Sequence, residues 1–122
     1  MTDRICIHSN GQKKPRLGAE DLVSCCASCS DGDGCEGAKY LITAWKFYET
    51  QGIVSGGSYE HKTGCRPYSF PICSHFDIDT PGVQKCPDET MRAPKCVKQC
   101  QPSYNKKYRE DKHYGDYFQS KW

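Results

Sequence analysis

The clearest periodic pattern of apolar residues lies between Tyr40 and Gln51. Apolar side chains recur there at steps of three and four residues, at Leu41, Ala44, Trp45 and Tyr48. This spacing places them on one face of an α-helix, and Gly52 follows where glycine commonly caps a helix. The pattern therefore predicts a helix over 40–51 whose apolar face, Trp45 above all, packs against a core.

Two shorter segments carry weaker helical signals. Residues 2–9 are typical of the end of a helix that begins before the chain does, and Asn10-Gly11 supplies a turn that ends it. Residues 19–23 predict a short helix. Its acidic residues, Glu20 and Asp21, fall in the first turn, where the helix dipole favours negative charge.

From Ile53 onward the helical period is lost and turn-forming residues dominate. Three cysteines and five prolines fall between Gly64 and Lys95, which predicts a long loop held by disulfides rather than a helix or a sheet. The last segment, 104–122, mixes aromatic side chains with charges of both signs, and we expect a solvated strand there. Its lysines and tyrosines resemble a nucleic-acid stacking surface, but its acidic residues dilute the charge, so no nucleic-acid partner is predicted.

Composition indicates one small domain with a thin hydrophobic core. Hydrophobic residues make up 36% of the 122 residues, and the mean hydropathy is −0.81. Ten cysteines fit a small exported protein that supplements such a core with disulfides. The net charge of +2 comes from 17 basic and 15 acidic residues spread along the chain, which gives no reason to expect a nucleic-acid or membrane partner.

The N-terminus and the cysteine content point in different directions. Disulfides form in oxidising compartments, yet the opening residues lack the apolar stretch of a signal peptide. No apolar run is long enough to span a bilayer either. Either the true N-terminus is missing or the cysteines do something other than form disulfides, and we expect the first.

The cysteine cluster allows more than one chemistry. Cys26-Ala27-Ser28-Cys29 has the spacing shared by zinc knuckles and redox dithiols. With Cys25 and Cys35 beside it, a four-thiolate zinc site is an alternative, but no second Cys-x-x-Cys pair follows about 12–20 residues later. A redox motif would need a preceding βαβ pattern, which is missing too. Disulfides are therefore the favoured role, and we predict no metal and no cofactor.

The histidines lack the spacing of a helical metal site. They are His8, His61, His75 and His113. Spacing does not exclude a catalytic Cys–His pair, because such partners meet only in the fold. Each histidine is nevertheless expected at the surface or in an ordinary hydrogen bond, since every cysteine lies in a cluster or beside a turn that is typical of disulfides.

Several strings of residues resemble the cathepsin B-like cysteine peptidases of the papain family. In chain order they are DRICIHSN, AEDLVSCC, the turn ending GCEG, AWKFYETQGIVSGG, GCRPYSFPIC and YREDKHYG. GCRPYSFPIC is the most specific, because it opens the occluding loop particular to these peptidases. The resemblance implies an incomplete α+β papain-like fold, mostly the helical side plus a disulfide-stapled occluding loop. Residues 1–64 would belong to the helical side, 65–103 to the occluding-loop region and 104–122 to the start of the barrel side.

The resemblance also implies a cysteine pairing. The four pairs are Cys25 with Cys96, Cys26 with Cys29, Cys65 with Cys100, and Cys73 with Cys86. Cys6 and Cys35 would pair with cysteines in a part of the family's sequence that is absent here, so they are expected to be unpaired.

The residues that carry the family's catalysis are expected to lie outside this chain. The Cys-Gly-Ser-Cys-Trp type of signature does not occur, and Met1 falls just after its place; the family's catalytic His and Asn lie beyond Trp122. Two features of the cleft depart from the family's pattern. Its Gly-Gly substrate wall appears as Gly37-Ala38, where a methyl group crowds the substrate backbone. Its two adjacent loop histidines appear as His75-Phe76, so that phenylalanine replaces the residue that binds the substrate's terminal carboxylate.

The resemblance therefore implies a fragment or truncated paralogue of a lysosomal or extracellular digestive peptidase, inactive as this chain. Its partners would be peptide or protein substrates of the full enzyme and the missing remainder of that enzyme. Two alternatives stay open: a non-catalytic disulfide-rich binding module or decoy, and a cytosolic zinc-binding protein that begins at Met1.

Overall fold

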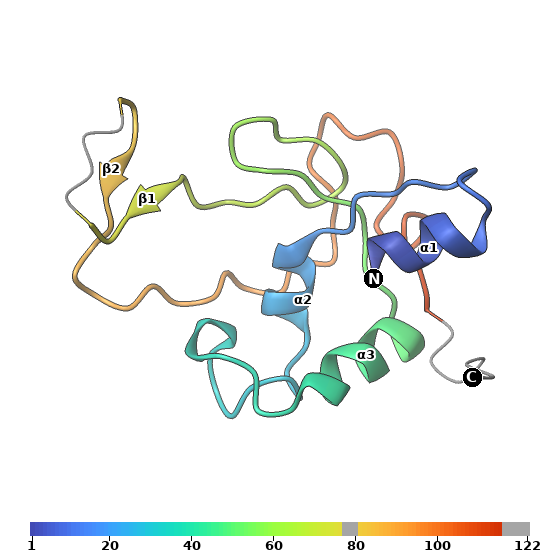
Figure 1. Ribbon diagram of the computed structural model, residues 1–122, viewed down its shortest axis with the longest axis horizontal. Coiled ribbons are helices and arrows are strands. Elements are labelled where there is room, and N and C mark those ends of the chain that lie inside the picture. The colour runs from blue at the N-terminus through green and yellow to red at the C-terminus, as the bar shows by residue number, and fades with distance from the viewer. Residues whose placement is uncertain (77–80, 116–122) are drawn as a thin grey trace.

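The computed structural model describes residues 1–76 and 81–115; residues 77–80 and 116–122 are not described. The last seven residues of the predicted strand over 104–122 therefore lie outside the described part. Figure 1 shows the helices toward one end of the long axis and two short strands at the other.

Three short α-helices form where the sequence predicts helices. They are α1 (Thr2–His8), α2 (Ala19–Cys25) and α3 (Leu41–Thr50). The predicted turn after α1 is present, with positive φ angles of 51° at Asn10 and 77° at Gly11. Gly52 has a φ of 70°, and its amide donates to the carbonyl of Phe47 at 3.1 Å, an arrangement that commonly ends a helix.

The apolar face of α3 is less buried than its period predicts. The burial is uneven along the helix: Tyr48 is 2% exposed, whereas Leu41 is 80% exposed. Trp45, expected in the core, is only partly buried; its ring lies under the Arg4 guanidinium at 4.9 Å and meets the Tyr48 ring edge-on. The prediction for Leu41 is wrong: α1 meets α3 at Trp45 and Tyr48, and Leu41 at the start of the helix stays at the surface.

The centre of the molecule is the extended segment 53–55, not a helix. Ile53 and His113 exchange two backbone hydrogen bonds of 2.9 Å, and Ser55 forms an antiparallel bridge with Leu17. Val54 is fully buried in the core. Its central apolar cluster is Val54, Cys65 and Tyr108, with Cys100 and Tyr104 packed against it. It is small, as the composition predicts.

The proline-rich loop contains a short ladder that the sequence does not predict. β1 (Cys73–Ser74) pairs in parallel with β2 (Gln84–Lys85), with Cys73 opposite Gln84. The Cys73–Cys86 disulfide holds the two segments together, so that two residues on each side meet in strand register. The prediction of a loop without any sheet is therefore wrong for these two pairs of residues.

The segment from Tyr104 to Gly115 is not a solvated strand. It consists mostly of turns, and Tyr108 and Asp111 are 6% and 2% exposed. The prediction fails because the polar ends of these two side chains hydrogen-bond to groups inside the molecule rather than to water.

Candidate functional site

The predicted substrate wall follows a cysteine-rich turn, residues 26–36, which begins after α2 and ends in the short 3₁₀ helix η1 (Gly34–Glu36). The Asp33 side chain caps η1 by accepting a hydrogen bond from the Cys35 amide at 2.8 Å. Gly34 approaches the backbone of α2 so closely that a Cβ would collide with the Val23 carbonyl. This contact fixes the turn against α2.

Gly37 and Ala38 leave this turn at the surface, and both are exposed. Gly37 has a φ of 101°, a conformation that residues with a side chain rarely adopt. No heavy atom lies within 4 Å of a Cβ placed on Gly37, so the space beside it is open.

His75 and Phe76 lie just after β1, and both are exposed, Phe76 by 75%. His75 lines a hollow of about 470 Å³ together with Cys35, Lys85 and residues 86–91. Gly37, Ala38 and Phe76 are not among the residues that line it. The structure thus brings His75 near the cysteine-rich turn but does not gather the four predicted substrate-binding residues in one cavity.

The two free thiols do not form a catalytic pair in the part of the chain that the structure describes. Neither Cys6 nor Cys35 hydrogen-bonds to a histidine there. Desolvation and the neighbouring Asp33 carboxylate raise the pKa of the Cys35 thiol. A nucleophilic cysteine needs the opposite change, a lowered pKa that yields the thiolate, so the surroundings of Cys35 disfavour acyl transfer.

A buried ionic cluster lies where α2 meets the segment 104–113. Asp21 is fully buried, and its carboxylate accepts hydrogen bonds from the Tyr108 hydroxyl at 2.7 Å, the Lys112 ammonium at 3.1 Å and the Val54 amide at 3.2 Å. The Arg66 guanidinium lies 3.5 Å away. Burial and the Asp21 carboxylate raise the pKa of Tyr108, so its hydroxyl stays a donor.

Glu20 joins this cluster from the neighbouring position. It is 6% exposed, lies 3.3 Å from Arg66 and accepts a 2.6 Å hydrogen bond from the Ser69 amide. Glu20 and Asp21 are therefore buried and paired with cations, rather than placed only to favour the helix dipole as the sequence indicated. No local pattern marks this role, because the hydrogen-bond partners of Asp21 lie 33 to 91 residues away.

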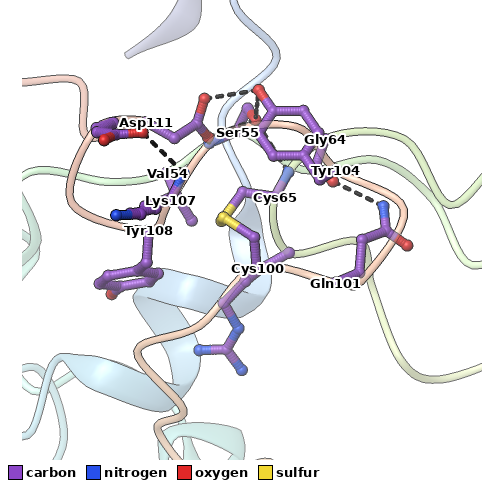
Figure 2. Close-up of a disulfide and its surroundings, with 12 residues drawn as sticks. Val54, Ser55, Gly64, Cys65, Cys100, Gln101, Tyr104, Lys107, Tyr108 and Asp111 are labelled. Carbon is purple, nitrogen blue, oxygen red and sulfur yellow. Dashed lines mark hydrogen bonds between the residues drawn. A yellow bond between two sulfur atoms is a disulfide. The ribbon is translucent and has the colours of Figure 1, made fainter.

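A second buried carboxylate, Asp111, organises the other side of the core. It accepts hydrogen bonds from the Ser55 amide at 2.8 Å, the Ser55 hydroxyl at 2.6 Å and the Tyr104 hydroxyl at 2.6 Å (Figure 2). Burial alone raises the pKa of Asp111, but these hydrogen bonds outweigh it and hold the pKa below its ordinary value of 3.8.

Four disulfides connect these segments: Cys25–Cys96, Cys26–Cys29, Cys65–Cys100 and Cys73–Cys86. They join the same pairs that the family resemblance implies, and Cys6 and Cys35 are free thiols. Cys65–Cys100 lies in the core beside Val54 and Tyr108 (Figure 2). Three cysteines of the alternative zinc site are in disulfides, and no group of His, Cys, Asp or Glu among the described residues could hold a metal ion.

Comparison with known proteins adds the decisive observation. A model of the family described as "Papain family cysteine protease" matches residues 1–121. The chain belongs to the papain family of cysteine proteases. Within this family it is similar to a cathepsin B-like cysteine proteinase of Schistosoma japonicum, with 47% identity over 117 residues, which are 95% of this chain and 32% of the relative. Cathepsin B-like cysteine proteinase 6 of Caenorhabditis elegans is 45% identical over 116 residues, which are 94% of this chain and 30% of the relative.

A solved structure of a papain-family relative agrees with these matches. Procathepsin B S9 from Trypanosoma congolense has a TM-score of 0.53 and 33% identity, over 83% of this chain and 26% of the other. The predicted papain-like fold is therefore confirmed. The chain spans about a third of the length of the curated relatives it matches. Within residues 1–76 and 81–115, no helix is both long and apolar enough to cross a membrane.

Proposed function

We propose that these 122 residues are the part of a cathepsin B-like cysteine peptidase that builds the helical side of its cleft and the occluding loop beside it. The complete peptidase would hydrolyse peptide bonds through a thiolate nucleophile and an acyl-enzyme. The observation that carries the proposal is the family match over residues 1–121, with 44–47% identity to cathepsin B-like proteinases.

By itself the chain is proposed to hydrolyse nothing. It contains no Cys-Gly-Ser-Cys-Trp string, and the raised pKa of Cys35 supports the absence of a reactive thiolate there. The nucleophile, base and oxyanion donors would come from sequence that the relatives have outside the matched third.

The proposal gives roles to the exposed residues of the site. Gly37 and Ala38 would lie along the extended substrate, and their exposure supports this placement. His75 and Phe76 would lie toward the substrate's C-terminal end. Phe76 offers neither a charge nor a hydrogen-bond donor to a terminal carboxylate. The full peptidase would therefore favour internal cleavage over release of C-terminal dipeptides.

We also infer peptides or proteins as substrates and a lysosomal or extracellular location. The four disulfides support the location, because such bonds persist in oxidising compartments.

The test compares this chain with the longer protein identified from the coding sequence on both sides of it. Both are incubated with a fluorogenic dipeptide substrate at mildly acidic pH. We expect turnover only from the longer protein, abolished by a thiol alkylator. Alkylator-sensitive turnover by the 122-residue chain would overturn its proposed inactivity. A folded longer protein without turnover would overturn the assignment as a peptidase and favour the binding module.

A further inference from the structure

One hydrogen bond holds the middle of the exposed segment 87–95. Disulfides flank this segment, Cys73–Cys86 before it and Cys25–Cys96 after it. Residues 87–92 between them are all exposed. Among residues 1–76 and 81–115, a single hydrogen bond links segment 87–95 to the rest of the chain. The Ala93 amide donates it to the Asp33 carboxylate at 2.7 Å.

Asp33 is well placed to act as a fixed point. The oxygen Oδ1 that accepts from Ala93 also accepts from the Cys35 amide at 2.8 Å, so one carboxylate joins segments 60 residues apart. The turn beneath it is fixed against α2 by the close approach of Gly34 to Val23. Gly37 and Ala38 follow directly after η1. Segment 87–95 can therefore move away from the turn only if the hydrogen bond between the Ala93 amide and Asp33 breaks.

We propose that Asp33 is a positioning residue that locks segment 87–95 onto the cysteine-rich turn that leads into Gly37-Ala38. Its effect on a substrate cleft rests on the proposed function, whereas the lock involves only described residues. Without the lock, the segment stays tethered by its flanking disulfides but moves between them. Asp33 touches no reacting atom, so its loss should alter substrate binding rather than the chemical step.

The charge of Asp33 is part of the lock. Hydrogen bonds to charged acceptors are about twice as strong as neutral ones. The charged and titratable groups around it are Arg92 on the segment, the Cys35 thiol and Glu36 on η1, and the Asp31–Lys39 ion pair of the same turn. The hydrogen bonds from Cys35 and Ala93, aided by Arg92, hold the pKa of Asp33 below its ordinary value of 3.8. The lock should thus persist at mildly acidic pH and open only as the pH falls through that lowered pKa.

Cleavage by trypsin tests the lock on the chain itself. The Ala93 amide belongs to the Arg92–Ala93 peptide bond, and Arg92 is exposed. Asp33→Ala should speed cleavage at this bond by about two- to tenfold, the range for loss of a hydrogen bond that water can partly replace. Asp33→Asn keeps an acceptor but loses the charge, so it should restore only part of the protection. The matched control is Asp31→Ala, which removes an exposed carboxylate two residues away and should leave the rate unchanged. Equal rates for Asp33→Ala and Asp31→Ala would overturn the proposal.

Hydrogen exchange keeps the test decisive if Asp33→Ala fails to fold. In the unsubstituted chain, protection of the Ala93 amide should fall as the pH drops through the pKa of Asp33. The Gln101 amide donates to the Cys65 carbonyl at 2.9 Å and should keep its protection over the same range. An Ala93 amide that is unprotected, or protected independently of pH while Gln101 stays protected, would also overturn the lock.

The longer protein described above tests the effect on the cleft. Asp33→Ala should raise KM for peptide substrates at an unchanged kcat, and Asp33→Asn should bring KM back in part. An unchanged KM, together with faster trypsin cleavage, would retain the lock and refute its effect on the cleft. If even the unsubstituted longer protein has no peptidase activity, the proposed function fails, while trypsin and hydrogen exchange still decide the lock.

Discussion

Replacing Asp21 with asparagine should destabilise the oxidised chain strongly, because Asp21 balances buried cations. It lies 3.1 Å from Lys112 and 3.5 Å from Arg66, and its side chain is 0% exposed. Asparagine keeps the size and one acceptor for the Tyr108 hydroxyl but removes the charge. Arg66 would still have Glu20, whereas the contacts of Lys112 among the described residues would be with neutral groups, chiefly the Gly52 carbonyl and the Tyr108 hydroxyl.

The expected cost follows from burial rather than from distance. Removing one partner of a buried ion pair typically costs about 3–5 kcal/mol. The surface pair Asp31–Lys39 is closer, at 2.6 Å, but its side chains are 71% and 46% exposed. Such a pair contributes no more than about 1 kcal/mol, because water and side-chain entropy offset most of the attraction. Asp21→Asn should therefore cost several times more than Asp31→Asn, although it breaks the longer contact.

Urea denaturation followed by circular dichroism, with all disulfides intact, measures the two free energies of unfolding. The double variant Asp21→Asn/Lys112→Met should recover part of the loss, because methionine removes the unpaired cation at similar volume. The reasoning is refuted if Asp21→Asn costs no more than Asp31→Asn. It is also refuted if the double variant is less stable than Asp21→Asn alone.

Three further predictions follow from the structure and the proposed function. Burial lowers the pKa of His113 from 6.5, so the contribution of the neutral His113 to the free energy of unfolding should be fully present above pH 6.5 and lost as the pH falls through the lowered pKa. His113→Gln should remove this pH dependence from a plot of the urea midpoint against pH. Replacing both cysteines of Cys25–Cys96 with serine should lower the free energy of unfolding by about 4 kcal/mol, because this disulfide has a sequence separation of 71 and closes a long loop. The same change at Cys26–Cys29, with a separation of 3, should cost far less, and melting temperatures would record the difference. In the complete peptidase, Phe76→His should raise the ratio of carboxydipeptidase to endopeptidase activity by about ten- to a hundredfold; an unchanged ratio would mean that another residue, such as Lys85, binds the carboxylate.

The helices could be predicted because local residues mark their ends. Asn10-Gly11 and Gly52 adopt the positive φ angles that stop α1 and α3. Periodicity alone could not tell how far α3 would be covered, since the cover comes from α1 and from the residues around Gly115. The pairing of the cysteines could not be derived from spacing either, which left a zinc site open until the structure placed three of its four cysteines in disulfides.

The polar core could not be predicted, because each of its bonds joins residues distant in sequence. In the sequence, nothing distinguishes Asp111 from the other charged residues of a segment that carries charges of both signs. Its partner Ser55 lies 56 residues away, in a turn-rich stretch with no period. Only the fold brings the two together, and the same holds for the lock between Asp33 and Ala93.

These polar contacts explain how so thin an apolar core orders the segment 53–55. Its three amides each have a partner from another part of the chain: Ile53 bonds to the His113 carbonyl, Val54 to Asp21 and Ser55 to Asp111. Two of the three acceptors are carboxylates, which bind amides more strongly than carbonyls do. Because the pKa of Asp111 is held below 3.8, its contribution should persist at mildly acidic pH and be lost only as the pH falls through the lowered value. Under the proposed function in an acidic compartment, Asp111 would therefore still be ionised and would hold the Ser55 amide at the pH where the complete peptidase acts.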